Sequence, residues 1–330
     1  CLDRALARLD YEGARREQAK LRLVGRYLGI GFATHAWRAG FPSVPGGKGY
    51  ITSGWEKTTV SVDPAGKVRA VIGTSPHGQG IVTTTAQIVA QQLGVLPRDV
   101  RVVHSDTDAV AQGNGTMGSR SLIVGGSATL LAAQQVRAKA IRLAAHLLQL
   151  DPQRVMLENA RFGDVGDPAR SIALAEVAAH AFAGPRDLPE GMEPCLEATA
   201  LFEPTNFSTC FGTHVCVAEV DPETGMVAIR RYLAIDDVGR AVNPTIVEGQ
   251  IHGGLAQGIG QALMEGAGYD VAGQPLAASF LEYATPRASD LPHFEVELTE
   301  TLSVVNPLGA RGIGEAGTIG APPAVVNAVL

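Results

Sequence analysis

Glycine is the residue that most constrains this chain, because 39 of its 330 residues are glycine and many stand in short strings with polar residues. Average glycine usage is roughly 7%, so this content is high. Glycine reaches positive φ angles and lets a backbone approach a bulky neighbour closely. The glycines follow no G-X-Y period. We therefore expect a globular protein with many tight loops and close backbone approaches.

The length and the charge pattern exclude several classes of protein. A hydrophobic content of 45% can fill a sizeable core, and 330 residues suit about two domains of roughly 150 residues each. The net charge of −6 is scattered, so no basic surface is expected for nucleic acid. The longest uncharged stretches are shorter than roughly 18 residues and are broken by polar residues, which argues against a membrane span. The four cysteines form no C-x-x-C pair, which argues against an iron-sulfur cluster or a disulfide scaffold and favours a cytoplasmic location.

Hydrophobic periodicity and turn residues predict strands that alternate with helices. Strands are predicted at 28–34, 57–62, 68–74, 213–220 and 227–235, with a short hairpin around Asn159. Helices are predicted at 2–23, 83–93, 126–150, 172–182 and 245–264. The prolines at 322 and 323 are expected to interrupt any helix near the C-terminal end.

Two Asp-Pro turns suggest an internal repeat. They stand at Asp63 and Asp221, 158 residues apart, and each joins two predicted strands ahead of a helix. A shared hairpin is common enough that chance is an equal alternative. We expect an N-terminal helix at 1–27 that continues from upstream sequence, a first half at 28–183, a linker at 184–199 and a second half at 200–330.

The segment 311–317 matches the G-x-G-x-x-G fingerprint of dinucleotide-binding proteins. Its context disfavours that interpretation, because residues 306–309 are typical of a turn rather than a strand, and no acidic ribose ligand follows. A nicotinamide dehydrogenase is therefore the weakest hypothesis. The same segment places Glu315 beside glycines, where its carboxylate can approach a ligand as a candidate base. A solvated loop glutamate is the ordinary alternative.

Three other glycine strings combine glycine with Gln, Ser, Thr or Arg, at 77–80, 115–121 and 253–258. Their side chains and amides suit a ligand that carries phosphates and carbonyls, and a loop that opens a helix offers N–H groups to an anion. Each string alone is better explained as a packing device than as a ligand site. Three together favour a ligand site.

With the strings at 237–244 and 309–323, these motifs resemble the molybdenum hydroxylases over nearly the whole chain. This family comprises the molybdopterin-binding large subunits of xanthine dehydrogenase, aldehyde oxidase and carbon monoxide dehydrogenase. The resemblance implies an α+β molybdenum-cofactor-binding domain of two related αβ halves, with mixed sheets and glycine-rich cofactor loops. The family's earlier cofactor domain and its substrate loop are absent from these 330 residues. The chain therefore looks like the second cofactor-binding domain, as a fragment or a split subunit.

The resemblance also implies site residues. The family's G-x-G-E loop carries the catalytic glutamate, which maps onto Glu315. No side chain is expected to ligate the molybdenum, because the pterin dithiolene holds it. The implied cofactor-binding residues are His77, Gly78, Gln79, Gly80, Thr116, Gly118, Ser119, Arg120, Ser121, Gln257, Gly312 and Gly314.

The activity implied is that of an oxidoreductase, the oxidative hydroxylation of an aldehyde, an N-heterocycle or carbon monoxide with oxygen from water. The implied cofactor is molybdenum-molybdopterin, in the cytosine dinucleotide form. Electrons would leave through iron-sulfur clusters and FAD on partner subunits, in a dimer of heterotrimers. The alternative is a non-catalytic or truncated subunit that binds the pterin cofactor, or merely packs in the assembly, without turnover.

Overall fold

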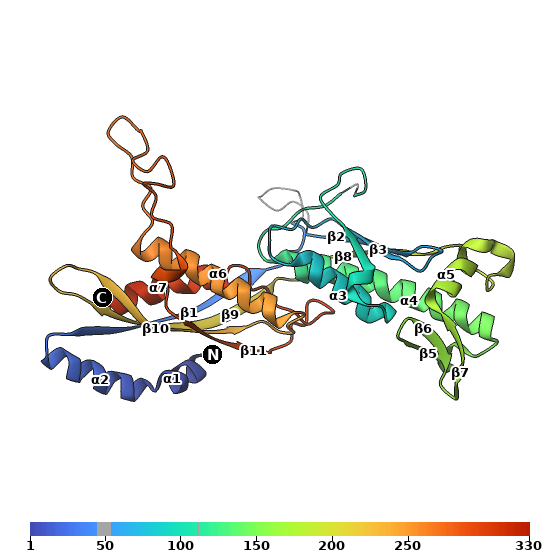
Figure 1. Cartoon of the computed structure of the whole chain (residues 1–330), viewed down its shortest axis with the longest axis horizontal. Coiled ribbons are helices and arrows are strands. Elements are labelled where there is room, and N and C mark those ends of the chain that lie inside the picture. Colours follow the sequence, from blue (N-terminus) through green and yellow to red (C-terminus); the bar gives the residue numbers. More distant parts are fainter. Residues whose placement is uncertain (45–53, 111) are drawn as a thin grey trace. The chain divides into compact units, whose positions relative to one another are not determined.

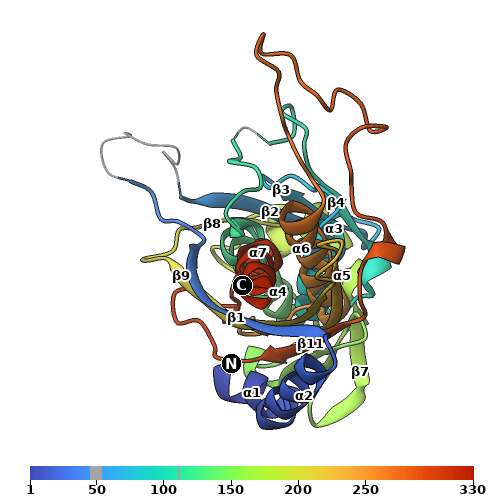
Figure 2. The ribbon, with the colours of Figure 1, turned by 90° about the vertical axis from the view of Figure 1, so that its left-hand side faces the viewer.

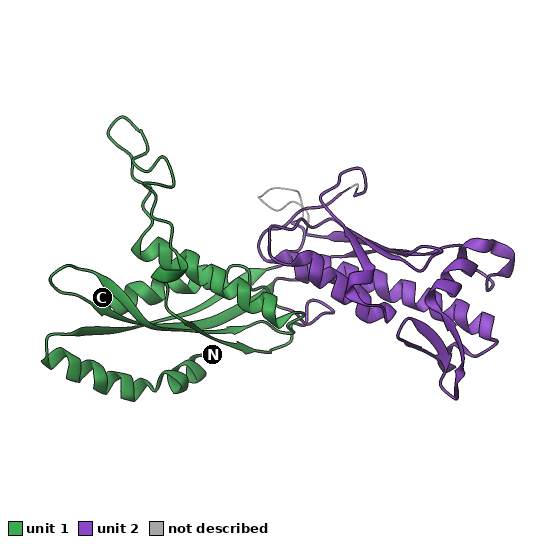
Figure 3. Cartoon of the chain, in the orientation of Figure 1, with its two compact units in different colours: residues 1–39, 208–303, 311–330 green, residues 40–207, 304–310 purple. Residues whose placement is uncertain are grey.

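The computed structural model describes residues 1–44, 54–110 and 112–330, which form two compact units (Figure 3). Unit 1 consists of residues 1–39, 208–303 and 311–330, and unit 2 of residues 40–207 and 304–310. Neither unit is continuous in sequence. The units therefore divide the chain differently from the consecutive segments 28–183 and 200–330 that the sequence suggested.

Unit 1 is built on a mixed four-stranded sheet with helices on both faces (Figures 1 and 2). In spatial order its strands are β1 (Tyr27–Ala39), β9 (Ser208–Val220), β10 (Val227–Asp237) and β11 (Phe294–Thr299). Strands β10 and β11 are parallel and the other pairs are antiparallel. Its helices are α1 (Leu2–Leu9), α2 (Tyr11–Leu23), α6 (Pro244–Leu263) and α7 (Ala316–Val329).

Alternation along the strands gives this sheet two cores, because successive side chains point to opposite faces. On β9, Cys216 and Ala218 pack with residues of α6 and α7, whereas Val215 and Val217 pack with residues of α1. The sheet of unit 1 is therefore covered on both faces.

Unit 2 has a second mixed four-stranded sheet and a small antiparallel sheet. The larger sheet has the spatial order β4 (Val100–Val103), β3 (Val68–Ile72), β2 (Glu56–Val62) and β8 (Leu196–Phe202). The smaller one contains β5 (Val155–Glu158), β6 (Arg161–Asp164) and β7 (Asp167–Ala173). The helices are α3 (Ile81–Leu93), α4 (Ser127–Leu148) and α5 (Leu174–Ala183), and a π-helical turn at Ser121–Gly126 leads into α4. Short 3-10 turns occur in this unit at Pro97–Asp99, Pro152–Arg154 and Pro185–Asp187, and in unit 1 at Ala288–Asp290.

The two larger sheets have the same topology. In chain order, β1-β2-β3-α3-β4-α4 is followed by β8-β9-β10-α6-β11-α7. In each series a hairpin is followed by a helix and then by a strand that lies parallel to the second hairpin strand. The first strands are exchanged, because β1 pairs with β9 and β8 pairs with β2. The predicted α+β class with related αβ halves and mixed sheets is confirmed, and the exchange explains why the units interleave along the sequence.

Two helix predictions near the ends of the chain are wrong. The single helix predicted at 2–23 is divided at Asp10, whose φ of 51° ends α1 and whose Oδ1 accepts a hydrogen bond of 3.2 Å from Gly13 N at the start of α2. Helix α7 runs through Pro322 and Pro323 instead of stopping. Its small and apolar residues are buried against β1, β9 and α6, and this burial outweighs the backbone hydrogen bonds that two prolines remove.

The string at 253–258, which we interpreted as a ligand loop, lies inside α6. Its glycines permit helix packing. A β-carbon on Gly254 would lie 2.9 Å from Gly317 Cα, and one on Gly258 would lie 2.7 Å from Ala321 Cβ. The amides of this string are in the middle of a helix, so they are not available to a ligand. No helix within the described ranges is long and apolar enough to cross a bilayer.

The packing of α6 on α7 predicts opposite effects for two alanine substitutions on one helix. Gly254→Ala should lower stability by about 1–3 kcal/mol through overpacking. Gly249→Ala, where no heavy atom lies within 4 Å of the added β-carbon, should instead gain up to about 1 kcal/mol of helix propensity. Thermal denaturation of both variants measures the difference, and equal melting temperatures would contradict this account of the interface.

Candidate functional site

The predicted site residues fall into two groups, one in each compact unit. Unit 2 holds the loop at 77–80 and the residues at 116–121. Unit 1 holds Gln257, Gly312, Gly314 and Glu315. Each group is described within its own unit.

The loop at 77–80 follows β3 and ends at the first turn of α3. Gly78 has a φ of 95°, and no heavy atom would lie within 4 Å of a β-carbon added there; Gly80, with a φ of 75°, is the N-cap of α3. Gln79 is half-buried; its Oε1 accepts from His77 N, and its Nε2 donates to Ser75 O at 3.2 Å. His77 is exposed. The Gln79 side chain thus fixes its own loop, and the N-cap residue of α3, Gly80, has no side chain with which to cap the amides that open the helix.

The second loop of unit 2 contacts the first through a shared carbonyl. Thr116 Oγ1 donates to Ser75 O at 2.5 Å and also lies 2.8 Å from Ser121 Oγ. Gly118 and Ser119 follow with φ angles of 55° and 48°, and the π-helical turn begins at Ser121. The structure therefore brings the predicted segments 77–80 and 116–121 together around Ser75.

A buried ion pair anchors this second loop. Arg120 and Glu56 are each 1% exposed, and Arg120 Nη1 donates to Glu56 Oε1. The same guanidinium donates to Gly115 O and to Trp55 O, both at 3.1 Å. Asn114 N donates to Glu56 Oε1, also at 3.1 Å. Arg120 therefore holds the loop to the start of β2, and direct contact of Arg120 with a cofactor stays a prediction.

Glu56 is a residue that sequence reasoning missed. Along β2 the buried positions are Glu56, Thr58, Val60 and Val62. An acidic side chain at one of the alternate strand positions that face the core requires a cationic or hydrogen-bonding partner, because burying an unpaired carboxylate is costly. The alternating pattern of residues 56–62 places Glu56 among the buried positions of β2, and this pattern could have predicted a buried cationic side chain nearby.

In unit 1, Glu315 is the N-cap residue of α7. It is half-buried, and its carbonyl accepts from Ile319 N at 2.9 Å in the first turn. Gly314, just before it, is exposed. Glu315 therefore lies at the boundary between solvent and the helix end, not in a free loop.

Arg311 holds the loop in front of Glu315. Its Nε lies 3.1 Å from Asp237 Oδ1 and donates to Thr301 O at 2.7 Å, and its backbone N donates to Val238 O at 2.9 Å. The Arg311 side chain is 12% exposed and Asp237 only 1%. The guanidinium also lies 5.3 Å from the centroid of the Phe211 ring. These contacts attach the loop to the ends of β9 and β10.

Cys210 gives the loop a second attachment. Gly312 N donates to Cys210 Sγ at 3.2 Å. Burial raises the pKa of the Cys210 thiol to about 12, so it remains protonated at neutral pH. Cys210 is therefore the small buried side chain that its residue type suggested, with a packing contact to the predicted catalytic loop.

Gln257 lies beside the same helix end, although it belongs to α6. Its side chain is exposed, and its Oε1 accepts from Thr318 Oγ1 at 3.3 Å. Thr318 is in the first turn of α7, three residues after Glu315. The structure therefore brings Gln257, Gly312, Gly314 and Glu315 to one end of α7.

The chain matches known proteins over nearly its whole length. Residues 4–292 match the family model described as a molybdopterin cofactor-binding domain. The carbon monoxide dehydrogenase large chain of Hydrogenophaga pseudoflava is 36% identical over 332 residues, which cover 100% of this chain and 41% of that protein. The nicotine 6-hydroxylase large subunit of Paenarthrobacter nicotinovorans is 35% identical, over 97% of this chain and 40% of that protein.

Solved structures agree with these matches. A Cu,Mo-carbon monoxide dehydrogenase in its carbon monoxide-reduced state superposes with a TM-score of 0.89 at 34% identity, over 99% of this chain and 42% of that chain. Quinoline 2-oxidoreductase from Pseudomonas putida 86 gives a TM-score of 0.89 at 35% identity, over 98% and 41%. The chain thus spans about two-fifths of the length of these relatives. The family suggested by the glycine motifs is confirmed: this chain belongs to the molybdenum hydroxylases and carries their molybdopterin cofactor-binding domain.

Proposed function

We propose that this chain is the cofactor-binding and catalytic part of a molybdenum hydroxylase, with Glu315 as its general base. The reaction is the oxidative hydroxylation of an aldehyde, an N-heterocycle or carbon monoxide, with oxygen from water. The observation that carries this proposal is that Glu315 is half-buried at the start of α7, behind a loop held by Arg311 and Cys210. A solvated loop glutamate would not need these attachments.

The loops of unit 2 fit a cofactor that carries phosphates and a pterin. Gly78 and Gly115 have φ angles of 95° and 70° and no close atoms around an added β-carbon, apart from Ser75 Oγ 4.0 Å from Gly115. Open backbone at these glycines lets an anionic ligand approach the N–H groups closely. The first turn of α3 follows a glycine N-cap and contains no acidic residue, and it offers further N–H groups. These donors suit the phosphates of the pterin cofactor, for which we propose the cytosine dinucleotide form.

In this proposal the cofactor and the residues around Glu315 have different roles in the reaction. When bound, the molybdenum cofactor supplies a Lewis acid and a two-electron redox centre. The Glu315 carboxylate accepts a proton from the water that provides the oxygen atom. Arg311 and Cys210 limit movement of the loop, so that the base stays in reach of this proton. A base placed in this way contributes about 10²–10⁴-fold to the rate.

Electrons leave through other subunits in this proposal. The four cysteines of the chain are free thiols, and Cys210 and Cys216 are buried. They have no spacing that would hold an iron-sulfur cluster. We therefore propose an iron-sulfur subunit and a flavin subunit with FAD as partners, in a cytoplasmic dimer of heterotrimers. Activity assays with an aldehyde, an N-heterocycle and carbon monoxide identify the substrate class.

Replacement of the proposed base tests the reaction. Glu315→Gln in the native complex should keep its molybdenum and lose turnover by at least about 10²-fold, because an amide cannot accept the proton. Glu300→Gln, an exposed glutamate of the same unit, is the matched control and should keep normal turnover. Metal analysis and steady-state rates on carbon monoxide, aldehydes and N-heterocycles provide the measurement. Turnover near that of the wild type with full molybdenum content would refute the assignment of Glu315.

Replacement of the loop anchor should affect cofactor content instead. Arg120→Ala leaves Glu56 buried without its cation, which costs about 3–5 kcal/mol locally and releases the loop at 114–121. We expect molybdenum per chain to fall while turnover per bound molybdenum stays near the wild-type value. Arg69→Ala, at an exposed position of β3, is the control. Normal molybdenum content combined with a slower rate per molybdenum would contradict a positioning role for Arg120.

A further inference from the structure

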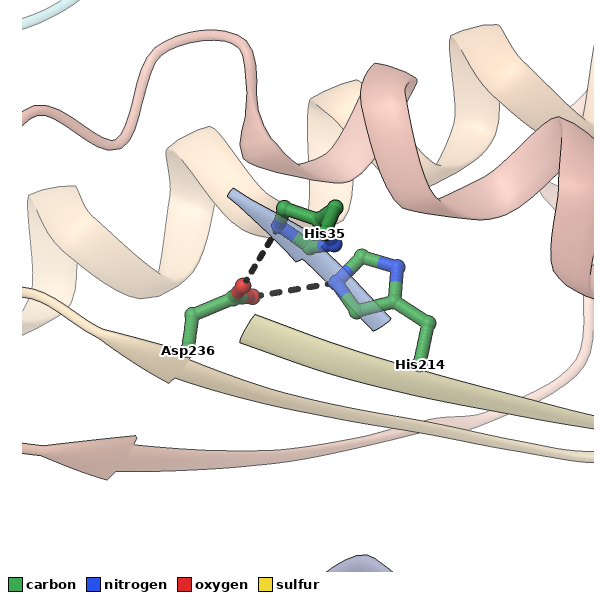
Figure 4. Close-up of side chains that lie close together, drawn as sticks. All are labelled: His35, His214 and Asp236. Atoms are coloured by element: carbon green, nitrogen blue, oxygen red, sulfur yellow. Dashed lines mark hydrogen bonds and ion pairs between the residues drawn. The ribbon is translucent and has the colours of Figure 1, made fainter. Parts of the chain in front are cut away.

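A cluster of three polar side chains lies in unit 1, on the face of the sheet that α7 covers. It consists of His35 on β1, His214 on β9 and Asp236 on β10, and their side chains point toward one another (Figure 4). His214 Nε2 lies 3.1 Å from Asp236 Oδ2, and His35 Nε2 lies 3.4 Å from Asp236 Oδ1. The two imidazole rings are nearly perpendicular, with centroids 5.0 Å apart.

Strand register and two glycines create this arrangement. His35 and Asp236 both pair with Gly212, from opposite sides of β9, and His214 is two residues further along β9 on the same face. A β-carbon at Gly212 would lie 2.0 Å from Asp236 Oδ1 and 3.0 Å from His35 Cε1. Another at Gly320 of α7 would lie 2.2 Å from His214 Nδ1. Only glycine at both positions leaves room for three polar side chains between the sheet and the helix.

The cluster is buried, and several of its polar atoms lack hydrogen bonds. The side chains of His35, His214 and Asp236 are 8%, 0% and 1% exposed. Within the described part of the chain, neither ring nitrogen of His35 nor Asp236 Oδ1 has a hydrogen-bond partner. Burial by itself would raise the pKa of Asp236, but its contacts with His214 and His35 outweigh burial and hold the pKa at about 2. A buried carboxylate therefore faces two imidazole nitrogens without a full set of hydrogen bonds.

We propose that His35 Nε2, His214 Nε2 and the carboxylate of Asp236 bind one zinc ion. Zinc bonds to histidine nitrogen and carboxylate oxygen at about 2.0–2.2 Å in a tetrahedron, which places neighbouring ligand atoms about 3.3 Å apart. His214 Nε2 and His35 Nε2 lie 3.1 and 3.4 Å from the two different oxygens of Asp236, and the candidate ligand atoms all lie within 4.8 Å of one another. Both imidazoles and the carboxylate therefore border one position that a cation can occupy after small shifts of these side chains. Two imidazoles and one carboxylate favour zinc over magnesium or calcium, because those two metals require more oxygen ligands.

His214 has the hydrogen-bond partner on its second ring nitrogen that is typical of a ligating histidine. His214 Nδ1 lies 3.2 Å from Tyr232 Oη, and Tyr232 is fully buried. A hydrogen bond from Nδ1–H to this oxygen leaves Nε2 free to bind a metal. The cation would offset the charge of Asp236 and join β1, β9 and β10 beneath α7. None of the three ligands is among the residues proposed for the molybdenum chemistry, and all three are buried beneath α7.

The test is element-specific and does not depend on turnover. The native complex is purified without chelator, and zinc and molybdenum per chain are measured by mass spectrometry. His35→Ala should contain one zinc ion fewer per chain than the wild type, whereas His293→Ala, an exposed histidine of the same unit, should contain as much as the wild type. Equal zinc in wild type and His35→Ala would overturn the proposal. Molybdenum in the same samples separates this outcome from loss of the main cofactor.

Zinc X-ray absorption on the wild-type complex keeps the test decisive if His35→Ala does not fold. We expect imidazole scattering from two histidines and metal–ligand distances of about 2.0–2.2 Å. Removal of zinc by chelation should lower the melting temperature by a few degrees, and addition of zinc should restore it. A wild-type complex without zinc, whose melting temperature does not respond to added zinc, would show that the cluster is a metal-free polar network.

Discussion

The close approach of α7 to the sheet of unit 1 is the constraint on which the rest of this unit depends. A β-carbon at Gly31 of β1 would lie 2.1 Å from Ala324 O, and one at Gly320 would enter the ring of His214. Glycine at position 31 lets strand backbone and helix backbone pack directly, and glycine at position 320 leaves room for the His214 ring beneath the helix. Because Glu315 is the N-cap of α7, this depth of packing also determines where the predicted base stands. A larger residue at any of these contacts would move the helix, and Glu315 would move with it.

The polar side chains of the unit 2 loops mainly form hydrogen bonds within unit 2, and these bonds fix the conformation of the loops. Gln79 and Thr116 both bond to the carbonyl of Ser75, and Arg120 is committed to Glu56 and to two backbone carbonyls. What remains available for a ligand is mainly backbone, at Gly78, Gly115 and the start of α3. We therefore propose that the polar side chains of these motifs act mainly by fixing the backbone amides that would contact the cofactor.

Local signals explain which parts of this structure the sequence could predict. The turn after Asp63 and the glycine after Leu93 predicted a hairpin and a helix end, and both are present, because turn and cap residues act on their immediate neighbours. The family and Glu315 were indicated by short motifs. The split at Asp10 carried no glycine or proline signal, and the exchange of β1 and β8 depends on pairing between distant segments. Tertiary burial also overrode the local rule at Pro322.

The histidine cluster could not be predicted, because it requires the register of three strands that are far apart in the sequence. That register also places two adjacent aspartates of β10 on opposite faces of the sheet. Asp236 faces the histidines, while Asp237 accepts from Thr299 Oγ1 at 2.8 Å and from Thr301 N at 3.0 Å and pairs with Arg311. One strand end therefore supports both the cluster beneath α7 and the loop that leads into α7. Because Asp236 and Asp237 are adjacent in β10, the cluster and the loop before Glu315 are anchored to neighbouring residues of one strand.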